Sequence, residues 1–314
     1  MKFFDADQVH ARLDYPSLVE ALCEHHLRDI DEVRSNVLEQ PTPTGATSYF
    51  LALPAWQRGR AIGAKLVTVF PDNEHTGTGL PSVQAVYVLF DGETGRPRAC
   101  IDGTALTLRK TAGDSAMGAR YLASRSASAM LMVGAGAMAP HLIMAHCAVR
   151  PSITRVEIWN RTPERAEALA ERLDLPGIDI SAVSDIEAAA RKADVISCAT
   201  MATDPLIKGA WLKAGSHLDL VGSYMPSQHE CDQDAIARAS VFVDSPWSAL
   251  DDCGEMVTAL ASGLLTRDNI LADNFKLARV EHPGRTSQDE ITLYKNGGGG
   301  HLDLMVAQFL CAED

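Results

Sequence analysis

The sequence predicts an α/β protein that joins a doubly wound, parallel-sheet (Rossmann) domain to an α+β domain. Three observations support this fold class. Short apolar runs alternate with helical periodicity after Ser124, a glycine-rich turn follows the first of these runs, and longer β-forming runs fill about the first 120 residues. Strands that alternate with helices of this length indicate βαβ units and a parallel sheet.

The first part of the chain opens with a predicted helix over residues 16–30. Runs rich in β-forming residues then follow at 47–53, 61–70, 82–90 and 98–101. Turn signals such as Asp91-Gly92 separate these runs, which is typical of a largely antiparallel sheet. Over residues 102–123 the apolar period becomes helical, and we expect this helix to bridge two domains.

The second part of the chain alternates strands and helices. Strands are predicted at 129–133, 156–159, 178–181, 195–199, 216–221 and 241–243. Helices are predicted from Ala137 and over 163–173, 186–192 and 233–239. The chain then offers one more strand at 291–295, a glycine run and a closing helix.

Composition and charge exclude several classes of protein. The 314 residues are 46% hydrophobic and 22% charged, which is ordinary for a folded chain. The 28 Lys and Arg against 41 Asp and Glu give 28 − 41 = −13, a charge that repels nucleic acid and anionic lipid. We therefore expect neither as a partner, although a local basic pocket for a small anion stays allowed.

Cysteine and histidine spacing predicts neither disulfides nor a metal site. The seven cysteines stand far apart without a Cys-x-x-Cys pair, and no histidines have the spacing of a metal-binding motif. The start of the chain lacks the basic and apolar regions of a signal peptide. The most membrane-like stretch, 127–149, is interrupted by a glycine-rich turn and by Pro140. The chain is therefore expected to be cytoplasmic, with reduced thiols and no membrane span.

The glycine-rich turn predicts a dinucleotide site. A strand at 130–133 runs into Gly134-Ala-Gly136-Ala137-Met138-Ala139, the Gly-x-Gly-x-x-Ala form of the dinucleotide fingerprint. Gly134 allows the tight turn, Gly136 lets the backbone approach a pyrophosphate, and Ala139 allows close packing of the helix. The phosphates would then meet a helix N-terminus, which favours anions.

The end of the second predicted strand favours NADP(H), with NAD(H) possible. An acidic residue there would bind the ribose 2′-hydroxyl of NAD, but the chain has Trp159-Asn160-Arg161-Thr162, with Arg165 one turn further on. A guanidinium suits a 2′-phosphate, because it offers a planar pair of donors. The alternative is that Arg161 is only a solvated loop residue.

Three cations in the first part are candidates for anion binding or proton transfer. Lys65 lies in an apolar strand, where burial would lower its pKa and make it a usable proton donor. It could instead be an edge-strand charge that faces water. Arg34 follows an acidic stretch and could be a local ion-pair partner. Arg109 could face inward, with Lys110 as its solvated neighbour, or the reverse.

Motifs along nearly the whole chain resemble the ornithine cyclodeaminase and mu-crystallin family, which includes ketimine reductases and archaeal alanine dehydrogenases. The motifs are Gly63-Ala-Lys-Leu-Val-Thr-Val-Phe-Pro71, Gly79-Leu-Pro-Ser-Val-Gln84, Asp102-Gly-Thr-Ala-Leu-Thr-Leu-Arg-Lys-Thr-Ala112, Val133-Gly-Ala-Gly136, Trp159-Asn-Arg-Thr162, Val221-Gly-Ser-Tyr-Met-Pro226 and Arg285-Thr-Ser-Gln-Asp-Glu-Ile-Thr-Leu293. Together they are specific for the family but not for one reaction.

The resemblance implies the roles of the two domains and of single residues. Residues 1–122 with 287–314 would bind substrate and form a homodimer, and 123–286 would bind the dinucleotide. Arg34, Lys65 and Arg109 fall on substrate-contacting positions. On or beside cofactor-contacting positions fall Ser82, Arg109, Ala137, Met138, Asn160, Arg161, Thr200, Gly222 and Asn296.

Departures from the family pattern argue against the cyclodeaminase reaction. The cyclodeaminase branch has an Asp and a Glu where this chain has Tyr224 and Leu51, so the charge partners of a diamine substrate are missing. Met138 and Gln228 also differ from the family's Gln and Lys. Tyr224 could donate a hydrogen bond near the proton path, or it could only pack.

The sequence therefore predicts an NAD(P)H-dependent oxidoreductase. It would reduce small imino acids such as pyrroline-2-carboxylate to L-amino acids, by hydride transfer to the imine carbon. Two alternatives stay open. One is an ornithine cyclodeaminase, which releases ammonia and recycles NAD. The other is a non-catalytic NADPH-binding protein of the mu-crystallin kind.

Overall fold

A computed structural model describes residues 1–312 apart from 32, 34, 43 and 75–78. It divides into two compact units. Unit 1 comprises residues 1–110 with 299–314, and unit 2 comprises residues 111–298. The predicted fold class is confirmed, because unit 1 holds a mixed sheet with helices and unit 2 holds a parallel sheet.

Unit 1 is built on a six-stranded sheet in the order β1-β6-β5-β4-β3-β2. Its strands are β1 (Lys2–Phe4), β2 (Asn36–Pro41), β3 (Thr47–Gln57), β4 (Ala61–Val69), β5 (Val83–Asp91) and β6 (Pro97–Asp102). Neighbouring strands run antiparallel except for β1 and β6. The largely antiparallel sheet is thus as predicted, while β1 and β2 were missed because both are short or exposed throughout.

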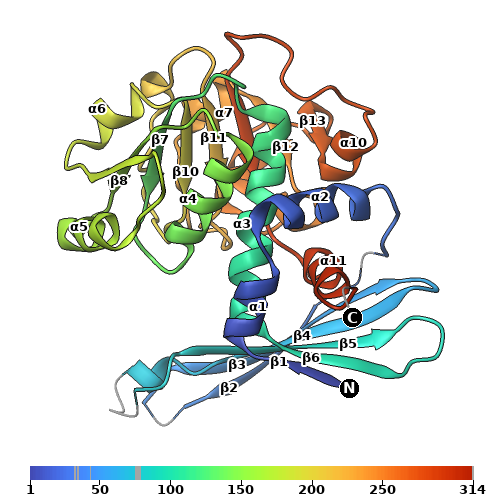
Figure 1. Cartoon of the computed structure of the whole chain (residues 1–314). Coiled ribbons are helices and arrows are strands. Elements are labelled where there is room, and N and C mark those ends of the chain that lie inside the picture. Colours follow the sequence, from blue (N-terminus) through green and yellow to red (C-terminus); the bar gives the residue numbers. More distant parts are fainter. Residues whose placement is uncertain (32, 34, 43, 75–78, 313–314) are drawn as a thin grey trace. The chain divides into compact units, whose positions relative to one another are not determined.

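Helices cover one face of this sheet. They are α1 (Ala6–Arg12), α2 (Tyr15–His26), the first part of α3 (Gly103–Leu122) and α11 (Gly300–Leu310). Figure 1 shows α11 lying over the sheet, with no helix of unit 1 on the opposite face. Asp5 and Asp14 cap α1 and α2 by accepting hydrogen bonds from backbone N–H groups.

Unit 2 is built on an eight-stranded parallel sheet in the order β13-β12-β14-β11-β10-β7-β8-β9. Its strands are β7 (Ala129–Val133), β8 (Arg155–Trp159), β9 (Asp179–Ala182), β10 (Val195–Cys198), β11 (His217–Leu220), β12 (Ser240–Val243), β13 (Ile270–Asp273) and β14 (Thr292–Lys295). The central strands are fully buried, as expected for a parallel sheet that helices cover on both faces.

The helices of unit 2 connect these strands (Figure 1). They are α4 (Met138–Val149), α5 (Pro163–Arg172), α6 (Ile186–Ala190), α7 (Gln233–Arg238), α8 (Pro246–Ala249), α9 (Gly254–Ala261) and α10 (Asn274–Ala278). Side chains of α6, α7 and α9 pack with those of β7, β10, β11 and β12 in one apolar core. The sequence did not predict β13 or α8 to α10, which are only four to eight residues long.

The division between the units differs from the predicted boundaries. It falls at 110 inside α3 rather than at 122, and at 298 rather than at 286. The second difference arises because β14 pairs with β11 and β12. A strand buried over its whole length needs a partner on each side, and the parallel sheet supplies both.

Candidate functional site

The turn between β7 and α4 has the geometry that a dinucleotide phosphate requires. Gly134 adopts φ +107°, and a Cβ there would lie 2.8 Å from the carbonyl oxygen of Ala199, so only glycine fits. A Cβ on Gly136 would meet nothing within 4 Å. Gly136 and Ala137 are exposed, and no side chain caps the N-terminus of α4. Its N–H groups and dipole are therefore available to an anion.

The loop after β8 holds this turn and adds positive charge. The side-chain oxygen of Asn160 accepts a hydrogen bond from Ala135 N–H at 3.1 Å, and its amide donates to the Thr162 carbonyl at 2.9 Å. Arg161 and Arg165 are exposed, and neither side chain makes an ion pair or hydrogen bond with a described residue. Thr162 is the N-cap of α5 and is also exposed.

A buried glutamate that the sequence reasoning missed joins two further loops at the same edge of the sheet. Glu230 Oε1 accepts hydrogen bonds from the N–H and hydroxyl of Thr200 at 2.6 and 2.9 Å. Glu230 Oε2 accepts from the N–H of Gly222 at 2.7 Å. Thr200 follows β10 and Gly222 follows β11. Glu230 therefore fixes the positions of both predicted cofactor residues.

The environment of Glu230 perturbs its titration. Burial raises its pKa to about 7, opposed by Lys295 and assisted by Glu255. Glu255 Oε1 accepts a hydrogen bond from the Glu230 N–H at 2.9 Å, and Glu255 Oε2 lies 3.8 Å from Lys295 Nζ. All three side chains are fully buried. The sequence signals for this cluster were Glu255 in the apolar helix α9 and Lys295 in β14, whereas Glu230 lies in a loop.

Three other predicted cofactor residues, Met138, Asn296 and Ser82, are half-buried or buried. Met138 is half-buried at the first position of α4. Asn296 is 2% exposed, and its amide donates to the Thr111 carbonyl and to Ser115 Oγ at 2.9 and 3.0 Å. Its side-chain amide is thus occupied within unit 2. Ser82, in unit 1, is half-buried in the bend before β5.

Unit 1 contains a buried cluster of charge around Lys65. Lys65 is 7% exposed, which decides against an edge-strand charge in water. Its Nζ lies 2.9 Å from Asp303 Oδ2 and donates to Asp303 Oδ1 at 3.2 Å and to Thr107 Oγ1 at 3.5 Å. Asp303 is fully buried on α11. The sequence reasoning missed it, although it is the one acidic residue of an apolar helix.

Lys110 is buried beside the same carboxylate. The sequence left open whether Arg109 or Lys110 faces inward, and Lys110 is 3% exposed. Its Nζ donates to the Gly299 carbonyl at 3.2 Å and lies 3.7 Å from Asp303 Oδ1. Two ammonium groups thus share one carboxylate, and the cluster carries 2 − 1 = +1. Thr107 and Lys110 are three residues apart and therefore lie on the same face of α3. Arg109 lies on a different face, which points away from Asp303.

Arg109 is half-buried and contacts other elements of unit 1. Its Nε donates to His10 Nδ1 at 3.1 Å and its Nη2 donates to the His10 carbonyl at 3.0 Å. The guanidinium carbon lies 4.8 Å from the centre of the Tyr15 ring. These contacts fix α1 and α2 to α3.

Neutral groups complete the surroundings of Lys65. Tyr87 is its cross-strand partner on β5 and is fully buried. Burial, and then the charge of Asp303, raise the Tyr87 pKa well above its ordinary value. Burial, followed by His26 and Lys110, lowers the His301 pKa well below its ordinary value. A Cβ on Gly63 would lie 2.1 Å from the Tyr87 hydroxyl, so glycine there makes room for the phenol.

The remaining two predicted residues are Arg34 and Tyr224. Arg34 lies outside the described residues. Tyr224, in the loop after β11, is 56% exposed, and its hydroxyl donates to the Met201 sulfur at 3.5 Å. The described residues contain no group of three or more His, Cys, Asp or Glu side chains that could hold a metal ion. In the same residues, no helix has the length and apolarity to cross a membrane.

The sequence matches a known protein family over nearly its whole length. Residues 8–312 match the sequence model of the ornithine cyclodeaminase/mu-crystallin family. The chain is 41% identical over 309 residues to a Delta(1)-pyrroline-2-carboxylate reductase of Paracoccus denitrificans, covering 98% of this chain and 96% of the relative. It is 39% identical over 308 residues to the Protein SAR DEFICIENT 4 of Arabidopsis thaliana, covering 94% of each.

A solved structure with the same fold is the Delta(1)-pyrroline-2-carboxylate reductase of Thermococcus litoralis in complex with NADH and L-proline. It superposes with a TM-score of 0.88 at 25% identity, over 100% of this chain and 97% of that chain.

Proposed function

The chain belongs to the ornithine cyclodeaminase/mu-crystallin family, and from this premise we propose that it is an NAD(P)H-dependent reductase of small imino acids. The proposed substrate class is cyclic or open 2-imino acids of the pyrroline-2-carboxylate type, and the product is the L-amino acid. The relative from Paracoccus denitrificans and the structure from Thermococcus litoralis, both named as reductases of this substrate, support the proposal.

The observation that carries the proposal is the buried cluster of Lys65, Lys110 and Asp303. Its charge of +1 matches the single negative charge of an imino-acid carboxylate. Lys110 would bind that carboxylate. Lys65, held by Asp303 and Thr107, would supply a proton to the imine nitrogen. A positioned acid contributes typically 10² to 10⁴ to a rate, which is of the right order for this step.

Reduced nicotinamide would supply the hydride for the imine carbon. The residues proposed to hold the dinucleotide are those of the β7–α4 turn and of the neighbouring loops: Gly134, Gly136, Ala137, Met138, Asn160, Thr162, Thr200 and Gly222. Gly134 and Gly136 let the backbone approach the phosphates, and the uncapped start of α4 offers N–H donors. Ser82 and Asn296 remain predicted contacts on the ground of the resemblance.

NADP(H) is the cofactor form that we propose. Support comes from Arg161 and Arg165, whose exposed guanidinium groups lack a partner among the described residues, and from the absence of an acidic residue in the segment 158–163. A 2′-phosphate would satisfy these charges.

The carboxylate clamp has two further predicted members. Arg34 stays a prediction because it lies outside the described residues. Arg109 stays a prediction in a supporting role, because His10 and Tyr15 already hold its guanidinium. Tyr224 is proposed only as an accessory hydrogen-bond donor, and its 56% exposure favours that over a packing role.

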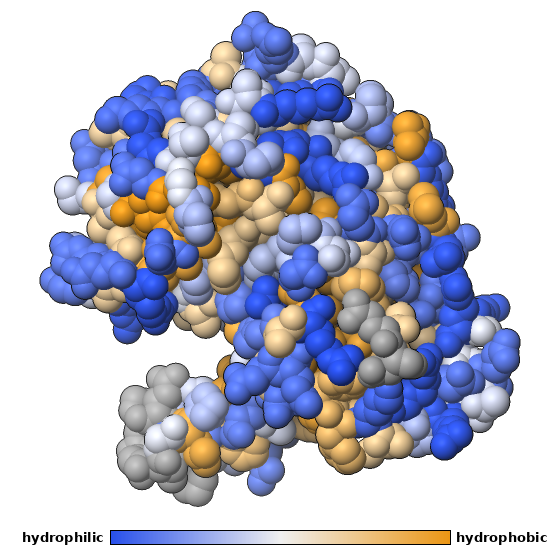
Figure 2. Space-filling model, viewed as in Figure 1, coloured by the Kyte–Doolittle hydropathy of each residue, from blue (hydrophilic) through white to orange (hydrophobic). Residues whose placement is uncertain are grey.

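A homodimer is proposed from the open face of the six-stranded sheet. The register brings apolar side chains into rows there, Trp56 beside Ile62 and Leu66 beside Val86. Trp56 is 46% exposed. A sheet face that stays in water normally carries polar residues, and contiguous apolar patches mark interaction sites. Figure 2 shows hydrophobic patches along the lower part of the view, where this sheet lies.

A cytoplasmic location is proposed as well. Among the described residues no pair of cysteines forms a disulfide, as is usual in a reducing compartment.

The proposed function is tested by supplying cyclic imines, or 2-oxo acids with amines, and following the loss of NADPH absorbance. Formation of the L-amino acid with equal loss of NADPH is expected. With ornithine, ammonia release without net NADPH loss would instead identify a cyclodeaminase. Normal NADPH binding without turnover of any imine would identify a non-catalytic binding protein.

A further inference from the structure

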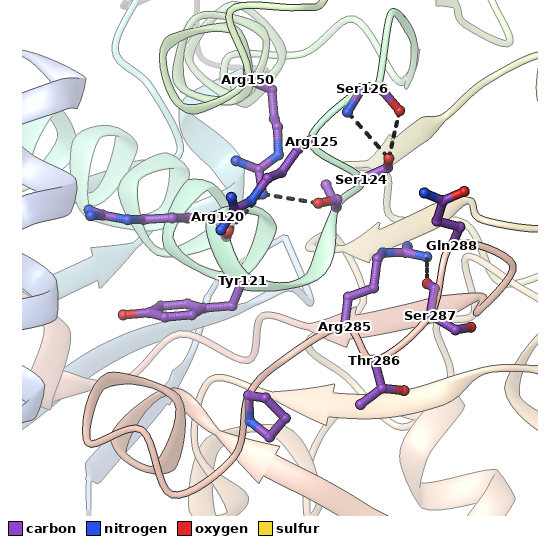
Figure 3. A pocket seen from close by; sticks show the side chains of 12 residues that line it. Arg120, Tyr121, Ser124, Arg125, Ser126, Arg150, Arg285, Thr286, Ser287 and Gln288 are labelled. Atoms are coloured by element: carbon purple, nitrogen blue, oxygen red, sulfur yellow. Dashed lines mark hydrogen bonds between the residues drawn. The ribbon is translucent and has the colours of Figure 1, made fainter.

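Four arginines of unit 2 line one pocket, at the edge of the parallel sheet where the strands begin. The pocket has a volume of about 520 Å³ and is lined by residues 120, 121, 123–126, 150, 283 and 285–288 (Figure 3). These segments precede β7, β8 and β14, whereas the proposed dinucleotide residues follow β7, β8, β10 and β11. The two sites thus lie at opposite edges of one sheet.

Positive charge predominates among the residues that line this pocket, and the nearby carboxylate of Glu290 accepts hydrogen bonds from Thr286 and Ser287. Among the described lining residues Arg120, Arg125, Arg150 and Arg285 are cationic, and none is Asp or Glu. Burial, and then the charges of Arg125, Arg120 and Arg285, lower the Arg150 pKa to about 10. This concentration of positive charge occurs in a chain whose net charge is −13.

Two of the arginines have a structural task, which uses all three nitrogens of Arg285 but leaves the Nε of Arg150 without an acceptor among the described residues. Arg150 Nη2 donates to the carbonyls of Ala119 and Ala123 at 2.7 and 3.0 Å. Arg285 Nε donates to the Leu122 carbonyl at 2.6 Å. These carbonyls end helix α3, where unpaired acceptors and the negative end of the dipole favour cations.

The remaining donors are the ones that point to a ligand. Arg150 is 8% exposed, and its Nε has no hydrogen-bond acceptor among the described residues. Leaving such a donor buried and unsatisfied costs about 1–3 kcal/mol. Arg125 is exposed, and its side chain makes no ion pair or hydrogen bond with a described residue. Besides burial, the charge of Arg125 helps to lower the Arg150 pKa, and Figure 3 shows both side chains among those that line this pocket.

We propose that this pocket binds a phosphate group, either free or as a small phosphomonoester, through Arg125 and the Nε of Arg150. A phosphate dianion fits better than a single carboxylate, because several guanidinium charges face the space and their planar donors match phosphate oxygens. This proposal is independent of the proposed reductase function.

The test is a calorimetric titration of the full chain at constant ionic strength. One arm uses inorganic phosphate and another uses glycerol 3-phosphate. Each is run with and without NADPH, which displaces phosphate from the Gly134 turn. Arg125→Gln is expected to weaken binding about tenfold or more, since hydrogen bonds to charged groups are strong. The matched control Arg172→Gln, an exposed arginine on α5 of the same unit, should bind like the unchanged chain.

The outcomes separate the sources of the ligand. Equal affinity in both arms indicates recognition of the phosphoryl group of a metabolite, and a preference for inorganic phosphate indicates the free ion. Either result supports the site if it depends on Arg125. Binding that is absent, or that Arg125→Gln and Arg172→Gln weaken equally, overturns the proposal. A crystal structure with phosphate, in which the anion lies away from Arg150 Nε, would also contradict it.

Discussion

At the scale of single residues, two buried ammonium groups share one carboxylate in unit 1. Asp303 is fully buried between Lys65 and Lys110. Removing one partner from a buried ionic cluster is costly, because the remaining charges lose their compensation. The arrangement therefore makes Asp303 a positioning residue whose loss affects stability as well as activity.

Asp303→Asn is expected to lower the free energy of unfolding by about 3–5 kcal/mol, since it removes the buried carboxylate that both ammonium groups face. Urea unfolding followed by circular dichroism measures this. The double variant Lys110→Met with Asp303→Asn should recover part of the loss, because one of the two charges is gone. A single variant as stable as the unchanged chain would mean that the cluster is solvated.

Arg161→Asp is expected to shift cofactor preference from NADPH toward NADH. The new carboxylate would repel a 2′-phosphate and accept a hydrogen bond from a ribose 2′-hydroxyl. The measurement is the ratio of kcat/KM for the two cofactors. Arg172→Asp serves as the control for a change of net charge. An unchanged ratio in Arg161→Asp would remove this loop from cofactor selection.

At the scale of elements, the loops after β10 and β11 depend on Glu230. Its raised pKa, about 7 against an ordinary 4.5, has burial as the main cause. The folded chain therefore binds a proton more tightly at this site than the unfolded chain does. Between about pH 4.5 and 7, folding is therefore coupled to the binding of a proton by Glu230. The free energy of unfolding falls as the pH rises through this window, because fewer protons are available.

Glu230→Gln should remove this dependence. From about pH 5 to about pH 8, the unchanged chain is expected to lose up to about 3 kcal/mol of unfolding free energy relative to Glu230→Gln, as follows from a shift of this size. Urea midpoints of both proteins across the range measure the difference. Parallel pH profiles for the two chains would show that Glu230 is ionised at all these pH values.

The elements that could be predicted are those whose pattern is local. The turn at Gly134 and the strands around it follow from glycine placement and apolar runs. Lys65 was singled out because a lysine in an apolar strand needs a partner, but the partner, Asp303, is distant in the chain. The choice between Arg109 and Lys110 stayed open because the turn of α3 that buries Lys110 depends on where α11 packs. Glu230 gave no local signal, since its partners are backbone groups of two other loops.

At the scale of the whole molecule, the open face of the six-stranded sheet predicts self-association. Val88→Asp puts a charge among the apolar rows of that face, beside Ala64. We expect it to convert a dimer to a monomer, because burying an unpaired carboxylate in an interface is unfavourable. Light scattering coupled to size-exclusion chromatography measures the mass.

The matched control is Val280→Asp, which changes a valine of unit 2 that is 80% exposed and should leave the mass unchanged. Circular dichroism confirms that each variant is folded. A folded Val88→Asp chain with the same mass as the unchanged chain would contradict the dimer, or place its interface elsewhere.

The most direct measurement is the kcat of Lys65→Met with Δ1-pyrroline-2-carboxylate and NADPH, beside the control Lys192→Met, an exposed lysine of unit 2. Loss of a positioned acid should lower kcat by about 10² to 10⁴, with NADPH affinity unchanged and the control fully active. A Lys65→Met chain that turns over at the normal rate would contradict the assignment of proton transfer to this buried ammonium group.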